Sequence, residues 1–276
     1  MKKITLILIL FYCFASISGY TQNDSAFTFI KTIRGKFSYF TVDRLDNLYL
    51  ITSTNQLKKI NANGDSAGVY NDVKRYGNIS SIDVTNPLKI LLYYKNFGAV
   101  VVLDRFLNNR NTINFRKQNI FSVQAIATSY DNNLWLFDEQ DNKLKKIDDD
   151  GKVLLESIDF RMQFDTVPVP TQLIDKENYV YLYDASKGFY IFDYYGAFKN
   201  RLPFLNWSSI AVSAKNMYGF YNHKLYSYQL NSLTLKEYQL PYYISNYTDI
   251  KVINGKLYFM NEEGISIYQV RQNVNW

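Results

Sequence analysis

The amino-acid sequence offers few side chains of the kinds that carry catalysis or bind transition metals. His223 is the single histidine in 276 residues, and Cys13 is the single cysteine. A Cys/His zinc site needs several such ligands, and a Ser-His-Asp triad would have to use His223, although no nucleophile-elbow motif accompanies it. His223 lies in the segment YNHKL, which is typical of a hairpin turn. The sequence therefore predicts no catalytic residue, no metal site and no cofactor.

Carboxylates are the remaining candidates for chemistry. Asp148–Gly151 (DDDG) resembles part of a calcium loop, but the EF-hand spacing with its closing glutamate is absent. A matching segment, Asn61–Gly64 (NANG), occupies the same place in an earlier copy of the surrounding sequence. Asx-rich tetrads that end in glycine form tight turns through side-chain hydrogen bonds to the backbone. We therefore interpret both segments as turns.

The two turns belong to a longer repeat. Asn55–Gly64 (NQLKKINANG) recurs 87 residues later as Asn142–Gly151 (NKLKKIDDDG). One apolar position returns along the chain at intervals of 43, 44, 45, 36 and 40 residues: Ile60, Leu103, Ile147, Phe192, Tyr228 and Tyr268. A polar residue follows it in every copy. A repeat period near forty residues is typical of β-propeller blades.

Each repeat contains four short segments with the composition of β-strands. The second segments are apolar and aromatic runs such as NLYLIT (47–52) and NLWLFD (133–138), each preceded by a turn-like stretch. A single four-stranded sheet cannot bury both of its faces, so such units must stack around an axis. We therefore predict an all-β fold, a six-bladed β-propeller of four-stranded antiparallel blades. This single domain would cover residues 26–270, with a C-terminal tail over residues 271–276.

The last repeat stops at Val270 and lacks a fourth strand. Ala26–Ile33 (AFTFIKTI), ahead of the first repeat, resembles the outer strands of the other repeats. We expect this N-terminal strand to close the last blade, which would tie the chain ends together and remove an exposed sheet edge.

Four aspartates lie near the predicted inner strands, where they could converge on a central channel: Asp43, Asp83, Asp175 and Asp249. Their sequence contexts differ, and aspartate at a strand end is common turn chemistry. A metal site in the channel is therefore the less favoured interpretation, and convergence of these side chains in a pocket is the observation that would support it.

The N-terminal residues differ from the rest of the chain. Two lysines precede an apolar run, Ile4–Ala15 (ITLILILFYCFA), and small residues follow it. This pattern predicts a signal peptide over residues 1–19, and hence an exported, periplasmic protein with no transmembrane segment in the mature chain. Tyr12 stands where a lipoprotein would need a small residue, so Cys13 would be lost on cleavage. The mature protein would then contain no disulfide.

The formal net charge is +6, two units of which come from the lysines of the predicted signal peptide. A basic balance attracts acidic protein surfaces, anionic glycans or nucleic acid. Export argues against nucleic acid, as does the absence of a lysine- and arginine-rich block. A protein partner and a glycan both remain open.

The connections between the predicted blades carry the most distinctive surface chemistry. In a four-stranded blade, the fourth-to-first connections and the second-to-third turns open on the same face. We predict partner-binding residues on this face: Arg75, Tyr76, Phe115, Arg116, Lys117, Phe160, Arg161, Phe164, Arg201, Trp207, Tyr242 and Tyr243. Aromatic residues and arginine are enriched at protein interfaces. The alternative for the aromatic residues is that their rings pack back between blades, where they would bury large areas.

Units of the form DNLYL…LKKINANGD resemble NHL-type and quinoprotein-like β-propellers over residues 26–270. The Lys-, Asn-, Ile-, Tyr- and Phe-rich composition, with a short MKK-type signal, resembles exported proteins of Bacteroidota. The resemblance implies a non-enzymatic protein that binds a protein partner, in one version an outer-membrane secretion or assembly channel. The plug-like subunit of the type 9 secretion translocon is the sharpest form of this hypothesis. The alternative is a glycan-binding or glycan-processing propeller with a carboxylate pair in an aromatic pocket.

Overall fold

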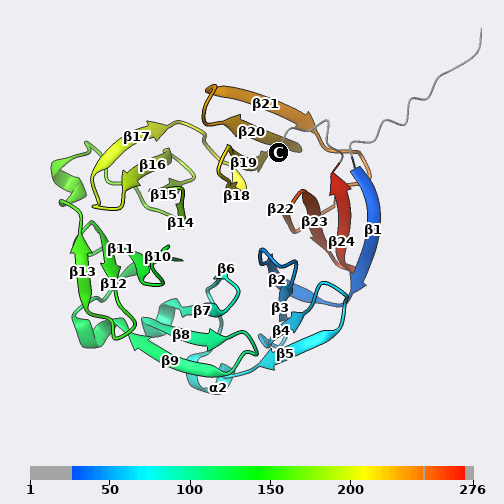
Figure 1. Cartoon of the computed structure of the whole chain (residues 1–276), viewed down its shortest axis with the longest axis horizontal. Coiled ribbons are helices and arrows are strands. Elements are labelled where there is room, and N and C mark those ends of the chain that lie inside the picture. Colours follow the sequence, from blue (N-terminus) through cyan, green and yellow to red (C-terminus); the bar gives the residue numbers. More distant parts are fainter. Residues whose placement is uncertain (1–26, 245, 271–276) are drawn as a thin grey trace, which may run out of the picture.

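Residues 27–244 and 246–270 are described by the computed structural model, and they form six four-stranded antiparallel sheets arranged in a ring (Figure 1). This architecture confirms the predicted all-β, six-bladed propeller. No helix within these ranges is long and apolar enough to cross a membrane. The predicted signal peptide (1–19) and the predicted tail (271–276) lie outside the described residues.

The first five blades take their strands from the channel outward in chain order. Blade 1 contains β2 (Phe37–Val42), β3 (Leu48–Thr52), β4 (Leu57–Ile60) and β5 (Ser66–Tyr70). Blade 2 contains β6 (Ser81–Asn86), β7 (Lys89–Tyr94), β8 (Ala99–Asp104) and β9 (Asn109–Asn114). Blade 3 contains β10 (Val123–Thr128), β11 (Leu134–Asp138), β12 (Lys143–Ile147) and β13 (Val153–Glu156). Blade 4 contains β14 (Gln172–Lys176), β15 (Tyr179–Asp184), β16 (Gly188–Asp193) and β17 (Phe198–Leu202).

Blade 5 contains β18 (Ser208–Val212), β19 (Asn216–Tyr221), β20 (Lys224–Gln229) and β21 (Thr234–Gln239). Blade 6 combines β22 (Asp249–Ile253), β23 (Lys256–Asn261) and β24 (Gly264–Val270) with the N-terminal strand β1 (Phe27–Arg34). Strand β1 pairs antiparallel to β24, from Phe27 opposite Val270 to Arg34 opposite Gly264. The predicted closure of the ring by the N-terminal strand is therefore confirmed.

Apolar side chains fill the spaces between neighbouring blades. On β8, Val101 and Leu103 pack toward blade 1, whereas Val100 and Val102 pack toward blade 3. Because both faces of β8 are buried in this way, this strand is a near-continuous apolar run and not an alternating one. Outermost strands are more exposed, as in β13, whose residues alternate between half-buried and exposed.

The recurring aspartates after the strands form one kind of turn. Asp148 Oδ1 accepts hydrogen bonds from the backbone N–H groups of Asp150 and Lys152, at 3.0 and 2.9 Å. Asp43, Asp104 and Asp193 accept from the residues two and four positions ahead in the same way. Each carboxylate replaces a missing backbone acceptor in a tight turn. The interpretation of DDDG as a turn is confirmed by these contacts.

Candidate functional site

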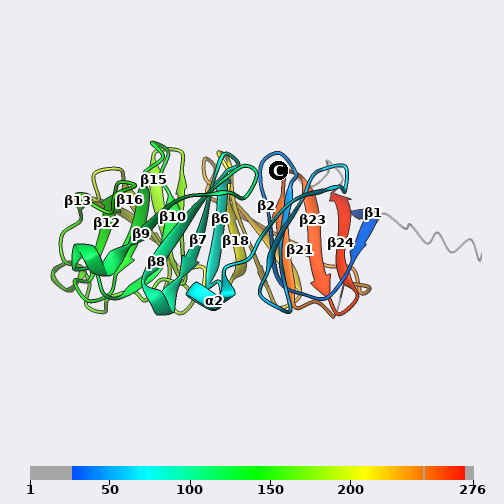
Figure 2. The ribbon, with the colours of Figure 1, turned by 90° about the horizontal axis from the view of Figure 1, so that it is seen from below.

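The blade-to-blade connections and the second-to-third turns lie together on one face of the ring, which we call the connection face. The first-to-second and third-to-fourth turns form the opposite face, which we call the turn face. Seen from the side, the ring is wider than it is tall, and the short helix α2 (Val73–Tyr76) lies at the connection face (Figure 2). Two further connections contain the single 3₁₀ turns η2 (Phe115–Gln118) and η3 (Phe160–Met162).

Turns η2 and η3 share a local design. Each begins after an Asx residue whose side chain accepts a hydrogen bond from the backbone N–H of the arginine two positions ahead, at 3.1 Å for Asn114 and 2.9 Å for Asp159. The intervening phenylalanine, Phe115 or Phe160, is fully buried. The arginine that follows, Arg116 or Arg161, is exposed. An Asx cap and a buried ring therefore hold an arginine at the surface in each connection.

The buried aromatic residues correct part of the predicted binding set. Tyr76, Phe115, Phe160 and Trp207 are each at most 7% exposed, so their rings do not reach a partner. Phe160 stacks on Phe192 with ring centroids 5.0 Å apart. These four rings pack between blades because a buried aromatic side chain removes a large apolar area from water.

Trp207 and Phe164 show how closely the connections are fitted to the blades. The Trp207 ring stacks on Phe204 with centroids 4.5 Å apart, and a Cβ atom placed on Gly219 of β19 would lie 2.4 Å from it. Only glycine leaves room for the indole there, which accounts for a glycine within a buried strand. Phe164 is half-buried and makes an edge contact with Phe160, with centroids 5.3 Å apart.

The remaining predicted residues are exposed, and they fall into distinct environments. Arg161 binds the Asp159 carboxylate through Nε at 3.0 Å, and this hydrogen bond lowers the pKa of Asp159. Arg201 donates to the Lys187 carbonyl at 2.9 Å and lies over the Tyr190 ring. Tyr243 stacks on Tyr268, whereas Tyr242 is 88% exposed. A partner-binding role for the exposed members of the set stays a prediction.

Arg75, Arg116 and Lys117 are the exposed predicted residues that lie around blade 2. We call this part of the connection face the blade-2 sector. Arg75 covers the Tyr76 ring at 4.9 Å, and Tyr76 makes an edge contact with Phe97 of η1 (Lys95–Phe97), the second-to-third turn of blade 2. A Cβ atom on Gly98, directly after η1, would lie 3.7 Å from the Arg116 side chain. Helix α2 and the turns η1 and η2 are therefore neighbours on the connection face.

Sequence reasoning missed two exposed residues of this sector. Lys74 precedes Arg75 in α2. Phe121, which is 55% exposed, lies between η2 and β10. The pair of adjacent cations in NDVKRYG was the available signal for Lys74. No periodic pattern marks Phe121, because its exposure depends on where η2 ends.

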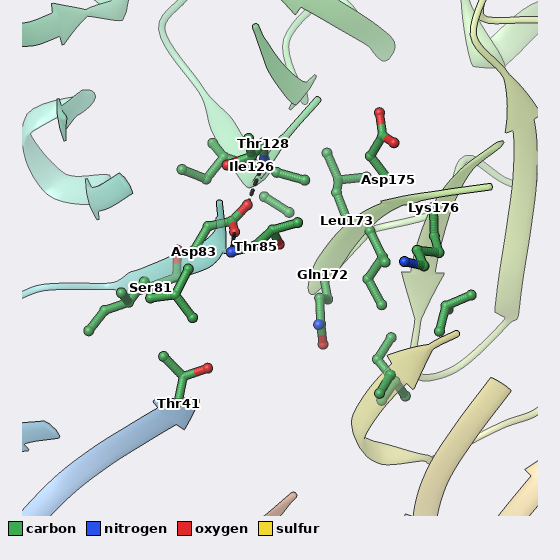
Figure 3. Close-up of a pocket in the computed structure, with 18 of the residues that line it drawn as sticks. Thr41, Ser81, Asp83, Thr85, Ile126, Thr128, Gln172, Leu173, Asp175 and Lys176 are labelled. Carbon is green, nitrogen blue, oxygen red and sulfur yellow. Dashed lines mark hydrogen bonds between the residues drawn. The ribbon is translucent and has the colours of Figure 1, made fainter. Parts of the chain in front are cut away.

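A central channel of about 1110 Å³ runs along the inner strands. Thr41, Ser81, Thr85 and Gln172 are among the polar residues that line it (Figure 3). Lys251 of β22 forms an ion pair with Asp249 at 3.1 Å and lies over the rings of Tyr39 and Phe40. Burial raises the pKa of Tyr39, and the charge of Lys251 opposes this shift.

The four channel aspartates are each engaged in separate structural contacts. Asp83 accepts a hydrogen bond from the backbone N–H of Thr128. The side chain of Asp175, on β14, lies apart from that of Asp83 (Figure 3). Asp175 accepts hydrogen bonds from Trp135 Nε1 at 2.9 Å and from the Tyr194 hydroxyl at 2.7 Å. Burial, together with this carboxylate, raises the pKa of Tyr194.

Asp249 accepts from the Ser209 hydroxyl at 2.9 Å and so joins blades 5 and 6, while Asp43 forms the turn described above. The four side chains therefore do not converge on one point. Among the described residues, no group of three or more histidine, cysteine, aspartate or glutamate side chains is placed to hold a metal ion. The sole histidine, His223, lies in the β19–β20 turn with its ring 6.5 Å from that of Tyr247.

Comparisons with known proteins identify the fold class. No protein-family model and no curated protein matches the chain. The chain is similar to the β-propeller domain of Cps50 (Swd1) from Myceliophteria thermophila, at 13% identity and a TM-score of 0.61, over 89% of this chain and 100% of that one.

Two lyases resemble the chain to a similar degree. One is a streptogramin B lyase, at 16% identity and a TM-score of 0.58, over 84% of this chain and 78% of that one. The other is virginiamycin B lyase from Staphylococcus aureus, at 12% identity and a TM-score of 0.58, over 88% and 87%. The protein is thus a β-propeller. Because one fold carries unrelated activities, its function must be argued from its own surfaces.

Proposed function

We propose that this protein is an exported, non-enzymatic β-propeller that binds a protein partner through its connection face. The observation that carries the proposal is the arrangement of exposed cations and rings on connections that are anchored by buried aromatic residues. Arg116 and Arg161 each follow a buried phenylalanine in a capped turn. A backbone segment that is fixed in this way loses little conformational entropy on binding, which favours a stable complex.

The channel contacts support a binding role over a catalytic one. A catalytic carboxylate needs to be free to exchange a proton or to contact a substrate. Here Asp175 instead joins blade 4 to blade 3 through Trp135 and also accepts a hydrogen bond from Tyr194 of its own blade. Asp249 joins blades 5 and 6 through Ser209, and it also pairs with Lys251. In these contacts the carboxylates act as links between blades.

The N-terminal sequence extends the proposal to a compartment. Residues 1–19 have the pattern of a signal peptide, which would deliver the propeller to the periplasm. There the protein would act as an accessory subunit of an outer-membrane secretion or assembly channel. The plug-like subunit of the type 9 secretion translocon is the version that the Bacteroidota-like composition favours.

Co-purification from the cell envelope tests this proposal. The full chain would carry an affinity tag after residue 276, the envelope would be extracted in mild detergent, and bound proteins would be identified and quantified. We expect an outer-membrane protein in a fixed ratio to the propeller, and a mature N-terminus near residue 19. Recovery of a soluble propeller alone would contradict the proposal, and retention on immobilised polysaccharide in that case would support the glycan-binding alternative.

A further inference from the structure

The strongest feature outside the channel is a group of cations on the connection face around blade 2. We call the group of Lys74, Arg75, Lys95, Arg116 and Lys117 the basic patch. All five residues are exposed. In the described part of the chain, none of their side chains lies within 4.0 Å of a carboxylate oxygen, although 13 such ion pairs occur elsewhere among the described residues.

Two acidic residues in segments of the connection face are engaged locally. Asp72, directly before α2, accepts a hydrogen bond from the Tyr70 hydroxyl at 3.3 Å. Glu139, in the second-to-third turn of blade 3, accepts from Ser122 Oγ at 2.8 Å. By contrast, Arg161 on the same face is neutralised by Asp159. The cations of the basic patch therefore form no ion pair with a described carboxylate and are open to the acidic groups of a partner.

Exposed aromatic rings lie in or next to the segments that carry the basic patch. The residues of the basic patch lie in three segments: α2 before β6, η1 between β7 and β8, and η2 after β9. Phe97 in η1 is 48% exposed and leans on Tyr76, and Phe121 beyond η2 is 55% exposed. Lys95 is fixed by a hydrogen bond to Gln124 Oε1 at 2.6 Å. Exposed cations and two exposed rings thus occur together in neighbouring segments of the connection face.

We propose that the basic patch binds an extended, acidic polypeptide segment of the partner, with an apolar side chain seated at Phe97. This inference rests on the proposed protein-binding function and names the chemistry of the partner. An extended chain offers side chains at about 3.3 Å per residue, so carboxylates can meet the cations while an intervening apolar side chain meets the ring. A polyanion without apolar groups would use the cations but would make no use of Phe97. The observations therefore favour a polypeptide.

A defined probe tests the inference independently of any natural partner. The probe is a fluorescein-labelled twelve-residue peptide of glutamates with leucine at two central positions, and a second peptide replaces the leucines with glutamate. Binding to the full-length protein is followed by fluorescence anisotropy at several salt concentrations. We expect saturable binding that weakens as salt rises, because the exposed charges are then screened. We also expect weaker binding of the all-glutamate peptide.

Charge-reversal variants locate the site. Arg75→Glu combined with Arg116→Glu should weaken peptide binding at least about tenfold, since two attractions become repulsions. The matched control combines Arg44→Glu with Arg110→Glu, which makes the same change in formal charge at exposed residues away from the basic patch. The control should bind the peptide within about threefold of the natural sequence, because distant exposed charges are screened. Phe97→Ser should remove the preference for leucine.

The outcomes separate this inference from the proposed function. Equal weakening by the two double variants, or binding of phosphatidylglycerol vesicles without binding of either peptide, would overturn the inference. If the partner still co-purifies with Arg75→Glu/Arg116→Glu, the protein-binding function stands and the basic patch is not its site. Lys74→Gln with Lys117→Gln, which removes charge without adding repulsion, gives the same test should the reversed pair unfold.

Discussion

Single residues in this propeller show how one chemical group can serve folding in several ways. Asp148 closes a turn, Asp159 caps a 3₁₀ turn and binds an arginine, and Asp175 links two blades through a tryptophan and also holds a tyrosine of its own blade. The first role was predicted from the sequence, because the DDDG and NANG segments repeat. The link made by Asp175 was not predictable, since its donors lie 40 and 19 residues away.

Lys145 of β12 belongs to a buried ion pair, and this pair gives a prediction at the residue scale. Its side chain is 5% exposed and binds the buried carboxylate of Asp138 at 2.8 Å, as well as Asp141. Replacing Lys145 by Met would leave Asp138 buried without its partner. We expect the free energy of unfolding at pH 7 to fall by about 3–5 kcal/mol. Chemical denaturation of the two proteins measures this difference.

The pH dependence of that difference follows from two pKa shifts. The hydrogen bond from Lys145 lowers the pKa of Asp141, so its contribution is present above its unfolded pKa near about 4 and is lost as pH falls further. Although burial opposes the effect, Asp138 and Asp141 raise the pKa of Lys145, so its contribution is lost only above about pH 10.4. The stability difference should therefore be largest between about pH 5 and 9. A difference that stays constant down to pH 2 would contradict this account.

At the scale of elements, strands were predictable from the sequence and the orientation of the connections was not. The apolar column from Ile60 to Tyr268 marks strands whose two faces are buried, and that pattern depends only on the chain's own repeat. In the connections, Phe115 and Arg116 are adjacent in sequence but point into the core and into solvent. Their directions are decided by the Asn114 cap and by packing of Phe115 against Tyr93 of blade 2. The sequence therefore predicted which segments form the connection face. It could not separate the buried aromatic residues of these segments from the exposed arginines.

The pairing of β1 with β24 gives a prediction at the same scale. Gly264 has a φ of +142°, and a Cβ atom there would lie 2.1 Å from the Ile33 carbonyl oxygen of β1. Gly264→Ala should therefore cost about 1–3 kcal/mol for the backbone conformation, together with a steric penalty that pushes β1 away. Gly64→Ala is the control, because Gly64 also has a positive φ of +102° but has open space around it, with Lys31 Nζ at 3.7 Å.

Thermal unfolding of both glycine variants measures the difference. We expect Gly264→Ala to lower the melting temperature clearly more than Gly64→Ala, because only the former disturbs the closure of the ring. Hydrogen exchange should then show the loss of protection concentrated in β1 and β24. Equal effects of the two substitutions would mean that closure by the N-terminal strand contributes little to stability.

At the scale of the whole molecule, six blades form a closed ring with two unlike faces. The turn face is built from Asx turns and from links between blades, such as the hydrogen bond from Asn254 to the Asp43 carbonyl. The connection face carries the anchored arginines and the basic patch. Each blade still has an outermost strand that pairs on one side only, but the anchored arginines and the basic patch lie on the connection face. We therefore propose the connection face as the side of the ring that binds the partner.

Site-specific photo-crosslinking in living cells that produce the protein tests this assignment most directly. A photoreactive phenylalanine analogue would replace Phe97 on the connection face or Phe106 in the β8–β9 turn of the turn face; the two side chains are 48% and 59% exposed. We predict a crosslink to one envelope protein from position 97 and none to that protein from position 106. Crosslinking from position 106 with none from position 97 would contradict the account, because the partner would then lie on the turn face.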